Sequence, residues 1–515
     1  MLPSPVNKKL SNLIYLPWYP FLFSAYPTLA LLVNNVAEIN YPAGTRTIIL
    51  ALVGTLAIFL VFRQAFHNPH RAAFACALFL FLFFAYGHIF NIITDNWEIN
   101  NLHSWLLGPW AALLILFSLW VFRWTTNYEK STPILNSLSL GLVILSIGQI
   151  VHWSFPRKVR MLGAEFAPIQ SLQIRDDKTP PDIYYIILDS YARADLLERA
   201  YGYDNTEFEE QLQEMGFYVA ACSQSNYLRT ETSLASSLNM DYLQNLDRAF
   251  QDPTKYRRRP LWQALRYGAV RWMLEEAGYR TIAFSTGFAW SELDDADVYL
   301  TPPLLWSNLT EFEALLLRTT LVRPLGDAGI INFEAIAGDR FRERTLYVFD
   351  QFEELAQEPG PKFVFIHIIQ PHPPFVFGPA GEHIDPEVFL NENNRYTSQA
   401  YSEGYQNQVT YVNYRLKSVL ETLILKSATP PIIILQGDHG PWIQSGGNRF
   451  KILNAYYLPG QNDVLYPFIS PVNTFRLVFN TFFNTDYEIL PDISYASPVP
   501  YIFDFLEVHN YCRSD

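Results

Sequence analysis

The chain has 515 residues, of which 50% are apolar and 17% are charged, and its formal net charge is −13. This composition excludes a disordered chain, and three cysteines in so long a sequence exclude a small disulfide-held scaffold. Residues 1–155 contain seven Lys or Arg and four Asp or Glu, which leaves 30 basic and 46 acidic residues for the rest. One soluble domain does not account for this division, and the acidic second part argues against nucleic acid as a partner.

The first part contains five stretches without charged side chains, at residues 13–33, 47–62, 72–93, 102–122 and 134–153. A helix needs about 20 mostly apolar residues to cross a bilayer. The second stretch is short, but Arg46 and Arg63 flank it, where long side chains can reach the lipid head groups. The sequence therefore predicts an α-helical membrane anchor of five spans over residues 1–156.

The basic residues of the anchor predict its orientation. The segments around Lys8, Arg63 and Arg123 lie on one side, whereas the loops with Glu38 and Asp95 lie on the other. Because basic loops stay in the cytoplasm, the N-terminus is expected there and the chain beyond the fifth span outside, in a multi-pass protein of the inner or plasma membrane. The basic cluster at 157–160 opposes this orientation, but the rule weakens for long translocated domains.

Residues 157–180 are a predicted linker, and an extracytoplasmic catalytic domain is predicted from 181 to 515. Short apolar runs rich in β-branched and aromatic residues occur at 182–188, 217–221, 281–284, 363–369 and 431–435, with helical patterns at 261–277 and 404–425. This alternation predicts an α/β domain with a mainly parallel sheet that is buried on both faces. In such sheets, ligands bind beyond the carboxyl ends of the strands.

Polar residues follow three of the predicted strands. Asp189 follows the first, His372 the fourth, and Asp438 with His439 the fifth. Carboxylates and imidazoles suit one divalent ion such as Zn²⁺ or Mn²⁺. Each residue alone has a common structural role as a cap, a turn or a rigid loop, but their joint position at strand ends favours a metal site. His367, inside an apolar strand, is expected to be a core histidine or to support the metal ligands rather than to bind the metal itself.

Two hydroxyl groups, those of Thr230 and Thr232, lie after the second strand where a helix is expected to begin. The free N–H groups of a helix N-terminus can hold phosphate or sulfate oxygens. A nearby metal would lower the pKa of such a hydroxyl and make it a nucleophile. The sequence leaves the choice between the two threonines open.

These motifs resemble the alkaline phosphatase and sulfatase superfamily, and within it the membrane-anchored group of lipoteichoic acid synthases and phosphoethanolamine transferases. The resemblance covers about residues 181–495, and Asp438-His439-Gly440 is its most specific short match. It implies that Thr230 is the catalytic nucleophile, with Ser233 as the matching serine three residues later, and that His372 contacts the substrate phosphate. The metal ligands that it implies are Asp189, Thr230, Asp438 and His439.

Arg193 lies one turn beyond Asp189 and is predicted to contact an anionic substrate, with an ion pair to Asp195 or Glu198 as the alternative. The resemblance is incomplete around Thr230, because the Cys/Ser-x-Pro-x-Arg context of sulfatases is missing. Sulfate-ester hydrolysis is therefore disfavoured. No convincing second set of ligands is found, so one metal ion is predicted.

The predicted function is a metal-dependent transferase that moves a phospho-containing head group from a membrane lipid donor to a lipid or glycan acceptor through a threonine-linked intermediate. The alternative is a phosphodiesterase, phosphatase or sulfatase-like hydrolase of the same fold. A non-catalytic scaffold is disfavoured because the ligand residues are present, and a transporter because the spans lack charged residues. Cys222 and Cys512 both lie on the predicted outer, oxidising side, where they could form a disulfide.

Overall fold

The computed structural model describes residues 14–35, 43–97, 99, 101–123, 128–154, 170–174, 179–254, 258–303, 309–386, 397–441, 444 and 446–512. Most of the predicted linker 157–180 lies outside these residues. The chain divides into two compact units. The membrane unit comprises Met1–Pro156 and Leu305–Ala337, and the catalytic unit comprises Arg157–Leu304 and Gly338–Asp515.

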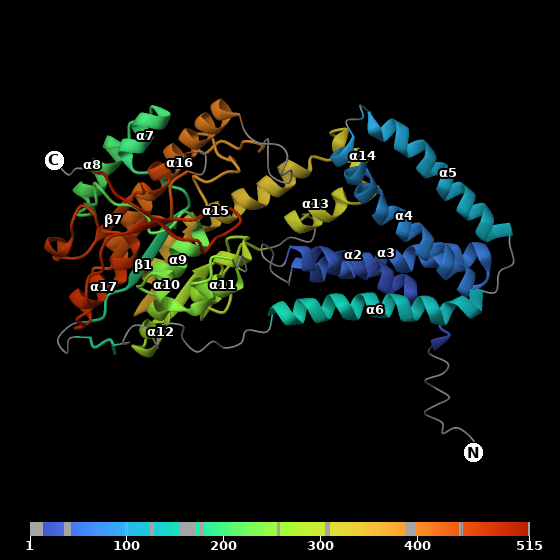
Figure 1. The fold of residues 1–515 in the computed structure, drawn as a ribbon, viewed down its shortest axis with the longest axis horizontal. Coiled ribbons are helices and arrows are strands. Elements are labelled where there is room, and N and C mark those ends of the chain that lie inside the picture. The colour runs from blue at the N-terminus through green and yellow to red at the C-terminus, as the bar shows by residue number, and fades with distance from the viewer. Residues whose placement is uncertain are drawn as a thin grey trace, which may run out of the picture. The chain divides into compact units, whose positions relative to one another are not determined.

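The membrane unit contains α2 (Tyr19–Asn34), α3 (Ala43–Phe66), α4 (Pro69–Asn96), α5 (Leu102–Arg123) and α6 (Tyr128–Ser154), shown in blue to cyan in Figure 1. Among the described residues, four helices, α3 to α6, are long and apolar enough to cross a membrane. Helix α2 has 16 residues and contains Pro27, so it is shorter than a typical span. Four spans are therefore supported, and the fifth crossing stays a prediction.

A segment from the second half of the chain belongs to the membrane unit. It contains α13 (Glu311–Arg318), α14 (Arg323–Asp327) and the start of α15 (Phe333–Gln357). In α13, Glu313 accepts a 2.8 Å hydrogen bond from Nε of Arg46, near the start of α3. In α14, Asp327 lies 2.7 Å from Nε2 of His103, at the start of α5. The sequence prediction placed all of 181–515 in one domain, whereas residues 305–337 pack with the membrane helices.

The catalytic unit is built on a seven-stranded sheet with the order β2-β7-β6-β1-β5-β3-β4. The strands are β1 (Ile183–Leu188), β2 (Tyr218–Val219), β3 (Arg280–Phe284), β4 (Val298–Leu300), β5 (Lys362–Ile368), β6 (Ile432–Gly437) and β7 (Asn454–Tyr457). All neighbours from β6 to β4 are parallel, whereas β7 is antiparallel to both β6 and β2. The predicted α/β fold with a mainly parallel sheet is therefore confirmed. A second, two-stranded sheet pairs β8 (Ser494–Ala496) with β9 (Leu506–Val508).

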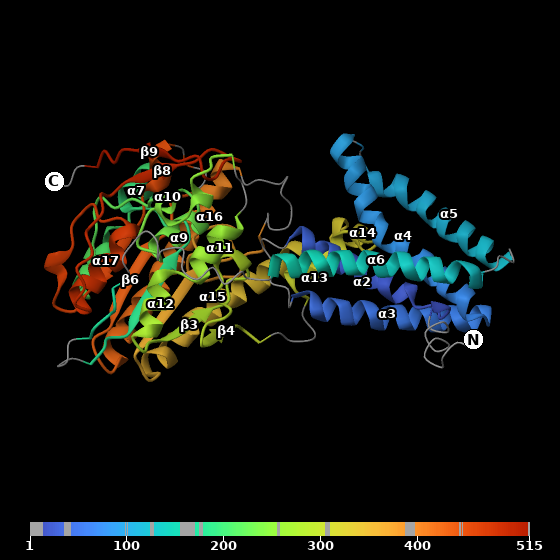
Figure 2. The same ribbon diagram turned by 60° about the horizontal axis from the view of Figure 1, so that its bottom comes forward.

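Helices cover both faces of the large sheet (Figures 1 and 2). Tyr184 and Ile186 of β1 pack with α7 (Ala194–Tyr201), α8 (Thr206–Glu214), α15 and α16 (Ser398–Lys426). Tyr185 and Ile187 face the other way, toward α9 (Thr230–Ser237), α11 (Arg259–Arg266), α12 (Ala269–Glu276) and α17 (Pro471–Phe482). Because successive strand residues point to opposite faces, an uninterrupted apolar strand buries both sides. The remaining short helices are α10 (Leu243–Leu246), η2 (Arg248–Phe250), η3 (Ala289–Ser291), η4 (Gly446–Phe450) and η5 (Asn462–Val464).

The predicted single helix over 261–277 is wrong at its centre, because α11 ends at Arg266 and α12 begins at Ala269. Gly268 lies between them against the chain that follows α9. A Cβ atom at this position would lie 2.9 Å from the carbonyl oxygen of Leu238. Close backbone packing therefore requires glycine here and interrupts the helix.

A buried ion pair fixes the amino ends of the two central strands. The Lys362 side chain is fully buried and its ammonium group pairs with Asp182. The backbone N–H of Lys362 also donates to Oδ1 of Asp182 at 3.2 Å. These bonds hold β1 beside β5, with Ile183 opposite Phe363. The opposite, carboxyl ends of the strands carry the candidate site.

Candidate metal centre and nucleophile

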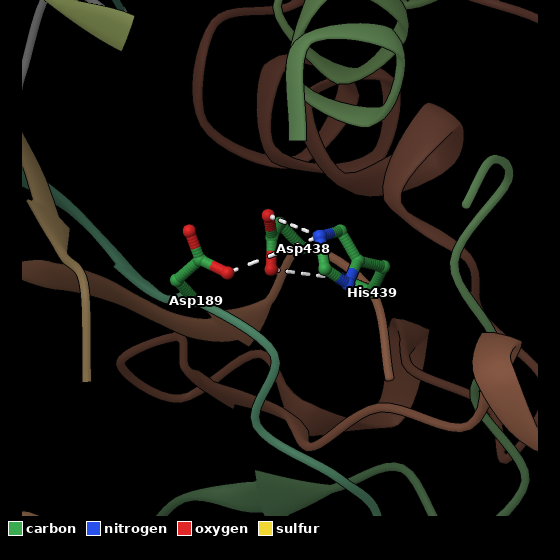
Figure 3. Close-up of side chains that lie close together, drawn as sticks. All are labelled: Asp189, Asp438 and His439. Atoms are coloured by element: carbon green, nitrogen blue, oxygen red, sulfur yellow. Dashed lines mark hydrogen bonds and ion pairs between the residues drawn. The ribbon is translucent and has the colours of Figure 1, made fainter. Parts of the chain in front are cut away.

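Asp189, Asp438 and His439 meet at the carboxyl ends of the central strands (Figure 3). Asp189 directly follows β1, and Asp438 and His439 directly follow the neighbouring strand β6. One potential ligand atom from each of the three residues lies within 4.8 Å of the other two. Asp189 and Asp438 are 2% and 1% exposed. The sequence predicted that these residues would converge because parallel strands place their carboxyl ends on one edge.

The environment shifts the pKa values of the two carboxylates, Asp189 and Asp438, in opposite directions. Burial alone would raise the pKa of Asp189, but the nearby His372, His367 and His439 outweigh burial and hold this pKa well below its ordinary value. Burial and the negative charge of Asp189 together raise the pKa of Asp438. A cation between the two carboxylates would relieve this repulsion.

The hydrogen bonds of His439 orient its ring for a cation. Its Nδ1 atom lies 2.9 Å from the carbonyl oxygen of Gly440. A carbonyl oxygen only accepts, so the ring donates from Nδ1, and in this tautomer Nε2 carries the lone pair. That Nε2 atom lies 3.4 Å from Oδ2 of Asp438 and 3.8 Å from Oδ1 of Asp189. A lone pair that faces two carboxylates fits a metal ion. A carbonyl oxygen bonded to the other ring nitrogen, as here, is a common way to orient a metal-binding histidine.

Asp438 has one oxygen anchored and one directed into the site. Its Oδ1 atom accepts 2.8 Å hydrogen bonds from the backbone N–H groups of Ser190 and His439. Among the described residues, its buried Oδ2 atom has no hydrogen-bond partner. An unpartnered buried carboxylate oxygen is costly. The donor set and this oxygen therefore fit a divalent metal ion.

Thr230 is the first residue of α9, and its hydroxyl oxygen lies 3.2 Å from Nε2 of His439. Thr232 differs, since its hydroxyl donates a 2.9 Å hydrogen bond to the carbonyl oxygen of Arg229. Ser233 ties the helix to the metal group through a 2.6 Å hydrogen bond to the carbonyl oxygen of Asp438. The geometry thus brings the Thr230 hydroxyl, rather than that of Thr232, beside the predicted ligands.

His372 and His367 lie on the other side of Asp189. The backbone N–H of His372 donates to the carbonyl oxygen of Asp189 at 3.1 Å, and its Nδ1 atom lies 2.6 Å from the carbonyl oxygen of Pro373. His367, near the end of β5, is 3% exposed and places Nε2 3.4 Å from Oδ2 of Asp189. Neither ring nitrogen of His367 has a hydrogen-bond partner among the described residues. His367 is therefore a buried histidine, as expected, whose Nε2 faces Asp189 beside the metal group, and its role stays a prediction.

Ser190 was missed by the sequence reasoning. Its backbone φ is +63°, in the left-handed region that few residues other than glycine adopt. This turn directs its N–H group at Asp438, while its hydroxyl donates to Oδ1 of Asp189 at 3.1 Å. Tyr405 secures the turn by donating a 2.8 Å hydrogen bond to the Ser190 carbonyl oxygen. Strain of this kind is typical of functional sites.

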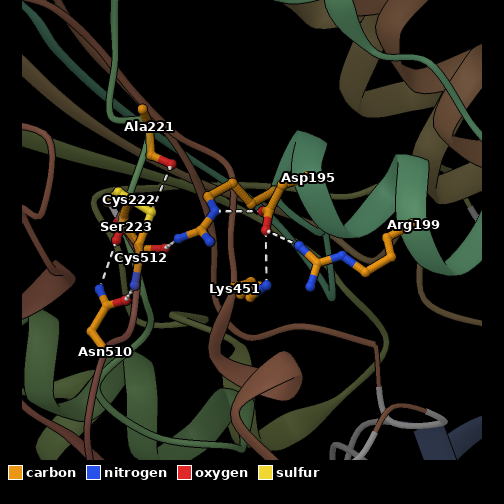
Figure 4. Close-up of a disulfide and its surroundings, with 9 residues drawn as sticks. Asp195, Arg199, Ala221, Cys222, Ser223, Lys451, Asn510 and Cys512 are labelled. Atoms are coloured by element: carbon orange, nitrogen blue, oxygen red, sulfur yellow. Dashed lines mark hydrogen bonds and ion pairs between the residues drawn. A yellow bond between two sulfur atoms is a disulfide. The ribbon is translucent and has the colours of Figure 1, made fainter. Parts of the chain in front are cut away.

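Figure 4 shows the disulfide between Cys222 and Cys512 and its surroundings. The predicted disulfide between Cys222 and Cys512 is present, with its Cα atoms 5.5 Å apart. Arg193 is 5% exposed and donates to Oδ1 of Asp195 at 2.7 Å and to the carbonyl oxygen of Ser223 at 3.1 Å. The ion pair with Asp195, the alternative that the sequence left open, is therefore formed, and a substrate contact of Arg193 stays a prediction.

The chain is similar to several solved structures at low sequence identity. The integral membrane phosphoethanolamine transferase EptA of Neisseria meningitidis is 14% identical over 87% of this chain and 88% of its own, with a TM-score of 0.34. The zinc-bound periplasmic domain of EptC from Escherichia coli is 13% identical over 62% of this chain and 87% of its own, with a TM-score of 0.40. A phosphonate monoester hydrolase of Agrobacterium radiobacter is 14% identical over 61% of this chain and 80% of its own, with a TM-score of 0.38.

No curated protein sequence matches this chain. The sulfatase family model matches residues 181–469, more than half of the chain. The match includes the metal group, Thr230 and the central strands. The chain therefore belongs to the sulfatase family of enzymes.

Proposed function

We propose that this protein is a metal-dependent transferase that moves a phospho-containing head group from a membrane lipid donor to a lipid or glycan acceptor. The observation that carries the proposal is the Thr230 hydroxyl, which lies 3.2 Å from His439 at the edge of the buried Asp189, Asp438 and His439 group. A hydroxyl at a helix N-terminus beside a metal-ligand group is suited to nucleophilic attack on a phosphate ester.

A single divalent ion, such as Zn²⁺ or Mn²⁺, held by Asp189, Asp438 and His439 with Thr230 as a further ligand, would supply positive charge that lowers the pKa of the hydroxyl and stabilises the charge of the phosphate oxygens. Ser233 and Ser190 hold Asp438 in place through its carbonyl and Oδ1 atoms. These hydrogen bonds keep the ligand atoms and the Thr230 hydroxyl in fixed relative positions.

In the proposed reaction, the Thr230 oxygen attacks phosphorus and forms a P–O bond, while the bond between phosphorus and the lipid alkoxide oxygen breaks and that oxygen takes up a proton. The acceptor hydroxyl then attacks the phosphothreonine, forms the product ester and loses its proton, and the released Thr230 oxygen regains one. The first N–H groups of α9 face the incoming phosphate oxygens. His372, whose backbone N–H is bonded to the Asp189 carbonyl oxygen, is the proposed contact of the phosphate group.

The membrane unit supports a lipid donor. An apolar groove of about 610 Å³ lies between α2, α4 and α6 and is bounded by Leu316 and Thr319 of the returning segment. Asn34 and His88 contribute polar groups to its lining. Confinement of donor and enzyme to one bilayer raises their effective concentration without further contacts.

The returning segment also supports an extracytoplasmic catalytic unit. It contacts the start of α3 through Arg46, the start of α5 through His103, and the final turns of α4, where the Arg323 guanidinium lies 4.0 Å from the Phe90 ring centre. These helix ends share one side of the membrane, opposite the basic Arg63 and Arg123 ends. Because polar domains do not cross the bilayer core, we place the catalytic unit on that non-cytoplasmic side.

The test is mass spectrometry of the full chain in nanodiscs after incubation with Zn²⁺ or Mn²⁺ and a bacterial lipid mixture. We expect an adduct on Thr230, and its mass would identify the head group. Thr230→Ala should lower turnover by about 10³-fold or more, whereas the matched Thr232→Ala variant should retain it. Full activity of Thr230→Ala would refute the mechanism, and release of the head group to water alone would identify a hydrolase instead.

A further inference from the structure

A polar pocket of about 610 Å³ lies beside the disulfide in the catalytic unit. Three cationic side chains contribute to its lining, together with one carboxylate and the amides of Gln224 and Asn448. The charged members are Arg193, Asp195, Arg199 and Lys451. We call these residues the cationic pocket.

One carboxylate holds all three cations (Figure 4). Asp195 accepts hydrogen bonds from Arg193 at 2.7 Å, from Arg199 at 3.0 Å and from Lys451 at 2.8 Å. Burial would raise the pKa of Asp195, but Arg193 and Lys451 outweigh burial and lower it, so the carboxylate is ionised. The pocket therefore carries two more positive charges than negative ones.

The cations are held rigidly enough to form a site. The side chains of Arg193 and Lys451 are 6% and 14% exposed, whereas that of Arg199 is 66% exposed at the rim. Among the described residues, Arg199 and Lys451 each make one hydrogen bond, to Asp195, and both side chains carry further N–H donors. These remaining donors are available to an oxyanion.

The disulfide fixes the opposite wall. Cys512 is linked to Cys222, and Asn510 donates a 2.8 Å hydrogen bond to the Cys222 carbonyl oxygen. The same C-terminal segment contributes Tyr511, whose side chain is largely exposed, to the lining. Aromatic and amide groups around fixed cations suit a polar ligand with a charged group, and the pocket volume exceeds that of one phosphate ion.

We propose that the cationic pocket binds the phosphate monoester group of a larger polar molecule, such as a phosphorylated sugar or a lipid head group. Guanidinium and ammonium groups recognise phosphate oxygens through charge-assisted hydrogen bonds. The rest of the chain beyond residue 155 has 46 acidic and 30 basic residues, so a local excess of positive charge is needed to attract an anion there. This site uses neither Thr230 nor the metal ligands, although it includes Arg193, which the sequence predicted to contact an anionic substrate.

The test is isothermal titration of the full chain in detergent, with Thr230→Ala in every sample and EDTA present so that no probe reacts at the metal group. The probes are glucose 6-phosphate, inorganic phosphate and dihexanoyl phosphatidic acid, with glucose as the neutral control. We expect at least one phosphate probe to bind, and the tightest one indicates whether the group comes from a sugar, a free ion or a lipid. Glucose should not bind.

Lys451→Gln and Arg199→Gln should each weaken this binding by about tenfold, because each removes a charge-assisted hydrogen bond. Lys426→Gln is the matched control, since Lys426 is an ion-paired lysine elsewhere in the unit, bound to Glu353. The exposed Arg199 can be replaced without disturbing the core, so a folding defect of Lys451→Gln would not prevent the test. Absence of phosphate binding, or equal binding by wild type and both pocket variants, would overturn the proposal.

Discussion

Replacing Asp438 with asparagine removes one of two carboxylates that face each other in the metal group. Ligand atoms of Asp189 and Asp438 lie within 4.8 Å of each other. At an effective dielectric constant of about 20, two unit charges at that distance repel by about 3 kcal/mol. Asparagine keeps the Oδ1 acceptor for the N–H groups of Ser190 and His439. We therefore expect Asp438→Asn to stabilise the metal-free protein and to abolish metal binding.

The measurement is thermal unfolding of the full chain in detergent at pH 7.5, with EDTA or with Zn²⁺. Since 1 kcal/mol shifts the melting temperature of a domain by about 2–4 °C, the variant should melt about 6–12 °C above wild type in EDTA. Zn²⁺ should stabilise wild type and leave the variant unchanged. Asp492→Asn is the control, because Asp492 lies outside the metal group and asparagine keeps the Oδ1 acceptor for Ser470 and Asn473, so this variant should keep the wild-type response to Zn²⁺. A metal-free Asp438→Asn variant that melts at or below the wild-type temperature would refute the reasoning.

Three further predictions concern the catalytic unit. Ser233→Ala removes the 2.6 Å hydrogen bond to the Asp438 carbonyl oxygen and should weaken metal retention by about tenfold. The measurement is the metal content after dialysis, and unchanged retention would contradict the role given to this bond. Lys362→Met leaves the carboxylate of Asp182 buried without its partner and should cost about 3–5 kcal/mol in urea unfolding, with partial recovery in the double variant with Asp182→Asn. Burial raises the pKa of Glu209 to about 7, so its charged form destabilises the fold increasingly between pH 4.5 and 7. Glu209→Gln should thus gain up to about 3 kcal/mol at pH 8 and less than about 0.5 kcal/mol at pH 4.5, and an equal gain at both values would show that charge is not the cause.

The strands of the catalytic unit could be predicted because their local pattern is strong. The runs at 182–188, 363–369 and 431–435 are apolar on both faces, which is typical of central parallel strands. Strand β7 (Asn454–Tyr457) was not predicted, because Asn454 and three small or aromatic residues give no clear period over four positions. Its place beside β6 depends on pairing with a strand far along the chain.

The convergence of Asp189, Asp438 and His439 could be predicted for a topological reason. Each residue directly follows a strand, and parallel neighbours share one functional edge. The sequence could not predict which of Thr230 and Thr232 lies beside the metal group, because this depends on where α9 begins relative to β6. That position is held by Ser233, whose bond to Asp438 joins residues 205 apart.

The position of His367 near the site could have been predicted from the sequence. Strand residues two apart share a face, so His367 lies on the same face as Phe365, which packs with the residues of α9. The helix that begins with Thr230 covers that face near the strand ends. A histidine at the last positions of such a strand is therefore placed toward the site, whereas its apolar surroundings alone predict a core position, and its role stays a prediction.

The return of residues 305–337 to the membrane unit shows the limit of local patterns. Helix α13 buries Phe312 and Ala314, as a helix packed on its own domain would, so its composition does not reveal which surface covers it. The decisive contact is the pair of Glu313 with Arg46, which are 267 residues apart. In the sequence, Arg46 is explained as a residue that flanks a short span. Glu313 is explained as the third helix residue of a capping box with Thr310. Each charge is explained locally, and only the three-dimensional structure shows that they neutralise each other.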